Sequence, residues 1–241
     1  MRFAVISDVH GNLEALRQVL RDIDDSGVQA VYSLGDHIGY GPDPDAAVKE
    51  ILKCRIPSVI GNHDRAAIDS KCLNWFNPIA RRSLTQSIAA LSQTALDAIG
   101  QMQPSAVWSG CLCVHGFPPD SVSTYRFEVP EAERLRIMAG MPAPVCFIGH
   151  THELALMSSD GKHVSSQRIK EGELSLSRAN RYIINVGSVG QPRDGNNNAK
   201  YVIWDTDSYR LQVKYVPYDI ASVSEKIIAA GLPRSHANRL W

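Results

Sequence analysis

The chain has 241 residues, 44% of them hydrophobic and 21% charged, and its formal net charge at pH 7 is zero. This size and composition are typical of one globular domain that buries its own core, so we expect a single domain over residues 1–241. Zero net charge disfavours a nucleic-acid coat or an anionic membrane surface as the main partner, because both are bound through an excess of Lys and Arg.

The first sixty residues predict strands that alternate with helices. The predicted strands span residues 2–7, 29–34 and 57–60, and the predicted helices span residues 12–26 and 42–54. In the first helix the apolar residues recur at helical spacing, with Asn12 as its N-cap and Gly27 as its end. Pro44 stands near the start of the second helix, where a missing N–H breaks no bond. This order predicts a parallel sheet with helical crossovers.

Residues 64–103 differ from their surroundings, because their apolar residues recur at broadly helical spacing and no strand is predicted. We expect a helical insertion here, beside the functional site. The later part of the chain is rich in short apolar runs. Its predicted strands are 106–109, 111–115, 144–148, 154–158, 163–169, 173–177, 182–186, 200–206 and 210–216, and its predicted helices are 130–140 and 219–230. The pair Asp160-Gly161 predicts a hairpin turn of type I′.

The chain contains no run of about 18 apolar residues, so no membrane span is predicted. The apolar stretch at the N-terminus is short and a charged motif follows it directly, which is unlike a signal peptide. The five cysteines are odd in number and irregularly spaced, at Cys54, Cys72, Cys111, Cys113 and Cys146. We therefore predict reduced thiols in a cytoplasmic protein and no zinc site built from cysteine pairs.

Five predicted strands run directly into polar residues that can bind metals. The segments are FAVISDVHGN, AVYSLGDHIGYG, SVIGNHD, CLCVHG and VCFIGHTH. Ligands of open α/β sheets bind beyond the carboxyl ends of the strands, so we expect these five segments to deliver their side chains to one place. The candidate metal ligands are Asp8, His10, Asp36, Asn62, His115, His150 and His152.

The chemistry of these candidates is consistent with a pair of divalent ions. Asp8 and His10 are two residues apart, so they face the same way on an extended segment, and His150 and His152 repeat that spacing. Asp36 offers a carboxylate whose two oxygens can bridge two cations. Mixed imidazole and carboxylate ligands suit Mn²⁺, Fe²⁺, Zn²⁺ or Co²⁺. Each motif alone could be an ordinary turn, but the ordered set of five indicates one joint site.

The ordered set D-x-H, G-D, G-N-H-D, H-G and G-H-x-H over residues 8–152 resembles the calcineurin-like metallophosphoesterase superfamily. The segments GDHIGYGP and NVGSVGQPRDG resemble its small prokaryotic phosphodiesterase-like branch. The resemblance implies an α/β fold, a four-layer α/β/β/α sandwich of two mixed sheets flanked by helices. It also implies two divalent metal ions, Mn²⁺ or Fe²⁺ first, with Zn²⁺, Co²⁺, Ni²⁺ or Mg²⁺ as alternatives. One ion would be held by Asp8, His10, Asp36 and His152, and the other by Asp36, Asn62, His115 and His150.

By the same resemblance, the activity is hydrolysis of a small phosphate ester or nucleotide by a hydroxide held between the two metals. His63 would not be a ligand; it would protonate the leaving alkoxide or hydrogen-bond the phosphoryl group. Arg193 and Arg65 are candidates for contacts to the phosphate. Phosphoprotein phosphatases carry GDxVDRG, whereas Gly39 and Tyr40 stand at its Asp and Arg positions here. We therefore do not expect that type of enzyme, and what orients His63 stays open.

Two alternatives remain. The first is a dinucleoside polyphosphate hydrolase, in which a base would stack on Trp75, Phe76, Tyr40 or Tyr125. The second is a non-catalytic scaffold with the same fold, for which Trp75 and Phe76 would mark a partner surface. We expect these two residues instead to pack in the core or to shape the rim of the site. We also expect His37 to be structural, and His163 and His236 to be ordinary surface histidines.

Overall fold

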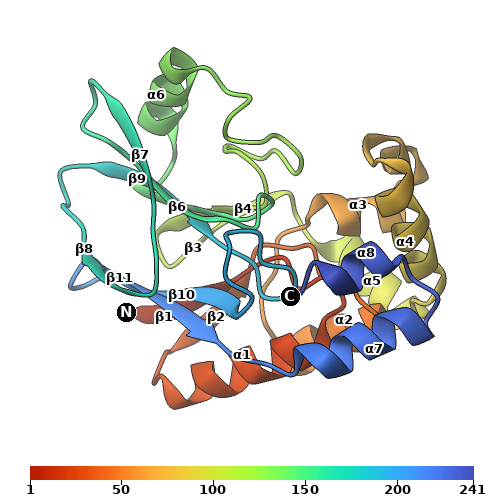
Figure 1. Cartoon of the computed structure of the whole chain (residues 1–241). Helices are drawn as coiled ribbons and strands as arrows, with labels where there is room; N and C mark the ends of the chain where they lie inside the picture. The colour runs from red at the N-terminus through yellow and green to blue at the C-terminus, as the bar shows by residue number, and fades with distance from the viewer.

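The computed structural model describes all residues from 1 to 241 and contains two mixed β-sheets that pack face to face (Figure 1). The first sheet has the strand order β2-β1-β10-β11-β8, and the second has the order β3-β4-β5-β9-β6-β7. The strands are β1 (Arg2–Ile6), β2 (Ala30–Ser33), β3 (Ser105–Trp108), β4 (Cys111–Val114), β5 (Val145–Ile148), β6 (Leu154–Ser159), β7 (Val164–Arg168), β8 (Gly172–Ser175), β9 (Arg181–Val186), β10 (Ala199–Asp205) and β11 (Arg210–Val216).

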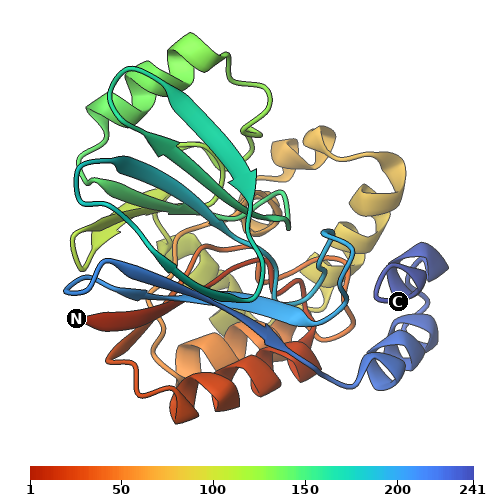
Figure 2. The same ribbon diagram turned by 60° about the vertical axis from the view of Figure 1, so that its left-hand side comes forward.

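Helices cover the outer face of each sheet, so the layers run helix, sheet, sheet, helix (Figure 2). The helices are α1 (Leu13–Asp25), α2 (Pro44–Lys53), α3 (Asn62–Ile68), the 3-10 helix η1 (Ser70–Trp75), α4 (Pro78–Ala89), α5 (Gln93–Gln101), α6 (Glu131–Gly140), α7 (Ile220–Ala229) and α8 (Arg234–Asn238). The core between the sheets includes Phe3, Phe147 and Trp204. Helices α1 and α2 pack on the first sheet and α6 packs on the second, which confirms the four-layer sandwich.

The residues predicted to begin and end α1, the helix that connects β1 to β2, have the predicted roles. The side chain of Asn12 caps α1 by accepting a hydrogen bond from the backbone N–H of Ala15. Gly27 follows the helix with a φ of +66°, a conformation that suits glycine. Strand β1 then pairs in parallel with β2 and antiparallel with β10, so the sheet is mixed. The carboxyl ends of β1 and β2 therefore lie side by side, and the segments that follow them meet.

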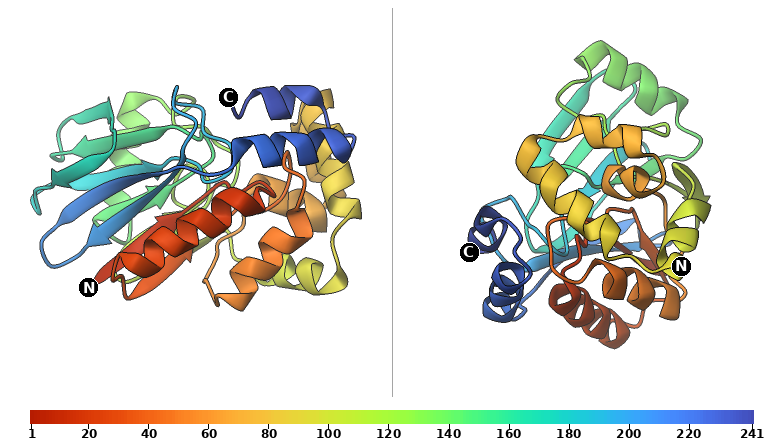
Figure 3. Two further views of the ribbon diagram at one scale, coloured as in Figure 1. Left: turned by 60° about the horizontal axis from the view of Figure 1, so that its bottom comes forward. Right: turned by 90° about the vertical axis from the view of Figure 1, so that its right-hand side faces the viewer.

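The predicted helical insertion is present as α3, η1, α4 and α5, and it lies at one end of the sandwich together with α7 and α8 (Figure 3). It has a small core of its own around Leu84, Ala95 and Ile99. A side-chain hydrogen bond of 3.1 Å joins His236 Nε2 in α8 to Ser83 Oγ in α4, so the C-terminal helices are fastened to the insertion. None of the helices is long and apolar enough to cross a bilayer.

Two predictions about local structure are wrong, and one short helix was not predicted. Residues 57–60 form no strand, because Ser58 and Val59 make only single bridges, to Ser33 and Gln103. The short helix α8 was not predicted, since five residues carry too little periodicity. The turn at Asp160-Gly161 does close a hairpin, but Ser159 pairs with Val164, so the connection has four residues and is not of type I′. Gly161 has a φ of +89° in this turn, and the Asp160 side chain accepts the backbone N–H bonds of Lys162 and His163.

Candidate metal centre

The structure brings the seven predicted ligands together in one buried cluster. Each lies on a segment that leaves a strand or begins a helix at the same end of the sandwich, and each side chain is nearly inaccessible. They are Asp8 and His10 after β1, Asp36 after β2, Asn62 at the start of α3, His115 after β4, and His150 and His152 after β5, with exposed fractions between 0% and 6%. The expected convergence at the strand ends is therefore observed.

Five of these residues hold a backbone conformation that side chains rarely adopt. The φ angles are +54° at Asp8, +49° at His10, +55° at Asp36, +67° at His150 and +61° at His152. Left-handed non-glycine residues are uncommon, and they persist only where the surroundings enforce them. Here the loops after β1 and β2 are bonded to each other through backbone N–H groups, which fixes the direction of their side chains. The backbone conformation of these loops thus directs the side chains of the five residues toward one point.

Hydrogen bonds fix which ring nitrogen each histidine presents. The Nδ1 atoms of His10, His115 and His152 lie 3.0, 2.8 and 2.6 Å from the carbonyl oxygens of Ile38, Leu34 and Gln191. A carbonyl oxygen only accepts, so in a neutral ring Nδ1 carries the proton and Nε2 offers its lone pair to the cluster. In His150 the pattern is reversed, because Nε2 lies 3.0 Å from the carbonyl oxygen of Ser123 and Nδ1 is the free nitrogen.

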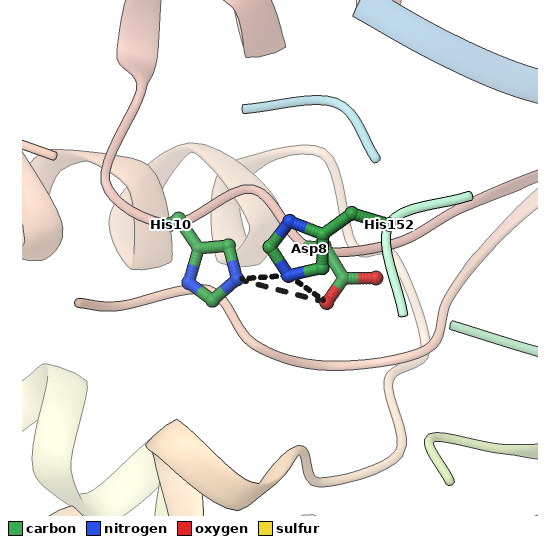
Figure 4. Close-up of side chains that lie close together, drawn as sticks. All are labelled: Asp8, His10 and His152. Atoms are coloured by element: carbon green, nitrogen blue, oxygen red, sulfur yellow. Dashed lines mark hydrogen bonds and ion pairs between the residues drawn. The ribbon is translucent and has the colours of Figure 1, made fainter. Parts of the chain in front are cut away.

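At the centre, the side chains of Asp8, His10 and His152 point toward one another (Figure 4). The Nε2 atom of His152 lies 3.1 Å from Nε2 of His10 and 3.2 Å from Oδ1 of Asp8. Burial lowers the pKa of His152 to about 4, so this ring is neutral at pH 7. The Asp8 Oδ1 atom is buried and has no hydrogen-bond donor. Lone pairs at these distances repel unless a cation lies between them, so the arrangement fits a divalent metal ion.

The charges of the cluster favour the same conclusion. Burial by itself would raise the pKa of the Asp36 carboxyl, but the neighbouring His115 and His63 outweigh burial and hold it well below its ordinary value. Burial would likewise lower the pKa of His115, yet Asp36 raises it to about 9. The Asp36 Oδ2 atom lies 3.2 Å from Nε2 of His115 and 3.7 Å from Nε2 of His10. Asp36 therefore lies between two groups of candidate ligands, a position that fits a bridging carboxylate.

A buried network behind the ligands holds the loop of Asp36 in place. The Asp64 carboxylate accepts hydrogen bonds from the backbone N–H groups of Asp36 at 2.7 Å and His37 at 2.9 Å. It also bonds Nδ1 of His37 at 3.0 Å, and Nε2 of His37 bonds Ser33 Oγ at 2.9 Å. All four side chains are almost completely inaccessible. His37 thus has the structural position expected of it, and Asp64 is a supporting residue that the sequence did not single out.

His63 stands at the first turn of α3 beside the cluster and is supported by aromatic rings. Its ring centroid lies 4.7 Å from those of His10, Tyr40 and Phe76. Its Nδ1 atom is buried without a hydrogen-bond partner and faces Gly39, where an added Cβ would come within 2.3 Å. Packing by Tyr40 and Phe76 therefore orients this histidine, in the absence of a carboxylate partner.

An open cavity of about 330 Å³ lies over the cluster. Its lining includes the ligands Asp36, Asn62, His150 and His152 together with His63, Arg193, Tyr40, Trp75, Phe76 and Tyr125. The four aromatic residues named by the sequence thus all reach the cavity. Trp75 and Phe76 form part of its rim, as expected, although Trp75 is 55% exposed. Tyr125 is stacked between Phe127 and His150, so both of its faces are covered.

One prediction about a histidine is wrong, and one prediction about an arginine gains no support from the structure. Arg65 is exposed on α3 and is absent from the lining of the cavity, so its position does not support a phosphate contact. His236 is buried, not on the surface, because α8 folds back and places its ring edge-on against Tyr40, with 5.0 Å between centroids. His163 is exposed, as predicted. The sequence could not show the position of His236, since it depends on contacts between distant helices.

Comparison with known proteins finds similar chains over the whole length. A family profile described as the calcineurin-like phosphoesterase superfamily domain matches residues 1–209. The uncharacterized protein MJ0912 of Methanocaldococcus jannaschii is 32% identical over 241 aligned residues, covering 99% of this chain and 96% of that protein. The crystal structure of a metallophosphoesterase from Sphaerobacter thermophilus is 36% identical with a TM-score of 0.86, covering 100% of this chain and 98% of the other. The hypothetical protein PH1004 from Pyrococcus horikoshii OT3 shares the fold, with a TM-score of 0.77 at 17% identity and coverage of 100% and 97%.

Proposed function

Because this chain belongs to the calcineurin-like phosphoesterase superfamily, we propose that it is a dinuclear-metal phosphoesterase that hydrolyses a small phosphate ester or nucleotide. Membership of the superfamily implies a phosphoric ester hydrolase that depends on divalent metals. The observation that carries the proposal is the buried cluster of Asp8, His10 and His152, whose ligand atoms lie together and in which the Asp8 Oδ1 atom has no hydrogen-bond partner. A scaffold protein would gain nothing from such a cluster, since burying unpaired polar atoms is destabilising.

The proposed ligand sets follow the contacts. Asp8, His10 and His152 have ligand atoms within 4.8 Å of one another, and so do Asp36, His115 and His150. Asn62 joins the second group, because its Oδ1 atom lies 3.1 Å from Nε2 of His115. Asp36 would bridge the two ions. When bound, the ions supply positive charge to the phosphate oxygens and lower the pKa of a water molecule that attacks phosphorus.

His63 has the position of a residue that acts on the substrate. Burial holds the pKa of His63 well below its ordinary value, so the ring is neutral at pH 7. Its buried Nδ1 has no acceptor, so the single proton lies on Nε2, the nitrogen left accessible where the ring lines the cavity. An N–H group there can donate to the phosphoryl oxygen or the leaving oxygen. Arg193, which lines the same cavity, would contact the phosphate.

The activity can be tested with bis-p-nitrophenyl phosphate. Protein supplied with Mn²⁺ should release p-nitrophenol, and chelation should abolish the release. The variant His63→Ala should keep its metal content and lose activity by about 10²–10³-fold, the usual loss when one hydrogen-bond donor to the developing negative charge is removed. No turnover with any divalent ion would refute the proposed function. Activity of His63→Ala within about threefold of wild type would refute only the role of His63.

A further inference from the structure

A second cavity adjoins the metal cavity and shares Arg193 with it. This cavity has a volume of about 650 Å³ and is lined by the segment around Arg193 and by residues at the end of α8, among them Arg239. Asn196 and Asn197 add polar side chains to its wall. The two cavities therefore meet at one arginine, which places the second cavity next to the metal cavity on the side of Arg239.

The side chains that line the second cavity carry positive charge and no negative charge. They include Arg193 and Arg239, neither of which forms an ion pair, and Trp241 at the end of the chain, but no Asp or Glu. Arg193 donates from Nη2 to the neutral side chain of Gln191 at 3.0 Å, and its buried Nε has no partner. The nearby Asp194 is already paired with Lys200 Nζ at 2.8 Å. Two guanidinium groups without a carboxylate partner are the usual means of binding a phosphate group in two-pronged geometry.

Contacts hold Arg193 in place beside the metal cavity, and α8 brings Arg239 to the same side of it. Lys200 is completely buried, and its Nζ donates to the backbone oxygens of Asn196 and Asn198, the latter at 3.0 Å, which fastens the segment that carries Arg193. The Arg193 guanidinium lies over the ring of Tyr40, 5.8 Å from its centroid. Tyr40 also contacts His236 of α8, the helix that Arg239 terminates. Tyr40 thus contacts Arg193 directly and the helix that carries Arg239 through His236.

We propose that the cavity between Arg193 and Arg239 binds a second phosphate group of the substrate, so that the preferred substrates are phosphodiesters that carry an additional phosphate beyond the scissile one. This inference rests on the proposed function, because the scissile phosphate would occupy the metal centre. Arg193 contacts the substrate at the junction, and Arg239 recognises the second phosphate. Arg239 would therefore favour substrates that carry a negatively charged phosphate away from the reacting phosphorus, as a specificity subsite does.

The test compares two matched substrates in protein loaded with Mn²⁺, the dinucleotide ApA and its 5′-phosphorylated form pApA. Wild-type protein should prefer pApA in kcat/KM. The variant Arg239→Gln should lower the ratio of the two kcat/KM values by about tenfold, the loss expected for one charge-assisted contact. The control is Arg234→Gln in the same short helix, which removes an exposed arginine outside the cavity and should leave the ratio and both rates unchanged.

The outcomes separate the subsite from the activity itself. A wild-type ratio near one, an unchanged ratio in Arg239→Gln, or failure to cleave either dinucleotide while bis-p-nitrophenyl phosphate is hydrolysed would each overturn the subsite alone. If Arg239→Gln changes only the inhibition by free inorganic phosphate, the cavity binds loose anions and the proposal is wrong. Loss of bis-p-nitrophenyl phosphate hydrolysis in wild-type protein would refute the proposed function, and the subsite with it.

Discussion

The Oδ1 atom of Asp8 lies 3.2 Å from Nε2 of His152, and neither atom carries a proton at neutral pH. Burial alone would raise the pKa of Asp8, but His152 and His10 hold it well below its ordinary value, so the group is a carboxylate. The proton of His152 lies on Nδ1, where it bonds the Gln191 carbonyl. Two lone pairs therefore face each other in a buried site. A cation between them would be bound by both lone pairs, and their repulsion would be removed.

Removal of metal should destabilise the protein as well as inactivate it. An ion present at about 100 times its Kd stabilises the folded state by about 2.7 kcal/mol, which corresponds to roughly 5–10 °C in Tm for a domain of this size. We expect EDTA to lower the Tm by at least about 5 °C, measured by differential scanning calorimetry. EDTA presaturated with Ca²⁺ is the control. A Tm that moves by less than about 1 °C with both reagents would contradict metal binding by the folded chain.

The variant Gly39→Ala should reduce kcat without removing metal. Gly39 has a φ of +89°, and an added Cβ would lie 2.3 Å from Nδ1 of His63, so the imidazole must shift. Displacement of a reacting group by about 1 Å can cost about 10²-fold in rate. Gly27→Ala is the matched control, because its φ is +66° and nothing lies within 4 Å of the new Cβ. Equal kcat values in the two variants would show that Gly39 does not position His63.

The variant Asp64→Asn should be strongly destabilised. The Asp64 carboxylate accepts bonds from the backbone N–H groups of Asp36 and His37, and an amide would place a donor against donors. We expect a loss of about 2–4 kcal/mol in the free energy of unfolding, measured with urea. Asp160→Asn is the control, since Asp160 also accepts two backbone N–H bonds but lies on an exposed turn. If both substitutions cost the same, the buried network does not support the loop of Asp36.

The buried His236 should make the protein less stable in mild acid. Burial, followed by the charge of Arg239, lowers the pKa of His236 to about 4 in the folded state, against an ordinary value of about 6.5. Between these values the unfolded chain binds more protons, so stability falls as pH drops from about 6.5 to about 4. His236→Gln should flatten this part of the curve of unfolding free energy against pH. A curve parallel to that of wild type would show that His236 does not contribute.

The sequence was sufficient for the general fold and for the convergence of the candidate ligands. Apolar runs predicted the strands, and each ligand stands just beyond the end of such a run, as in the step from Val114 to His115. Once the strands pair in a sheet, their carboxyl ends lie side by side, and the candidate ligands that follow them come together. The prediction failed at residues 57–60, where a similar apolar run makes only one bridge to Ser33 at the end of β2 and one to Gln103, so no ladder continues along it. The roles of the seven candidate residues as metal ligands stay predictions until the metal content is measured.

The support of His63 could not be predicted, because it depends on contacts between elements that are distant in sequence. Tyr40 comes from the loop after β2, and Phe76 comes from the insertion. His236 reaches Tyr40 only because α8 folds back over α4. An aromatic residue in a loop has no periodic pattern that reveals its partner. The sequence showed that the usual carboxylate was missing at Gly39 but not what replaced it.

Metal stoichiometry in purified protein tests the dinuclear centre most directly. Protein reconstituted with Mn²⁺, passed over a desalting column and analysed by inductively coupled plasma mass spectrometry should hold two ions per chain. The variants His152→Ala and His115→Ala, which each remove a ligand from a different group, should each retain about one ion, and Asp36→Ala should retain fewer than either. Less than one ion per chain in wild-type protein, or a content that none of these substitutions changes, would contradict the account.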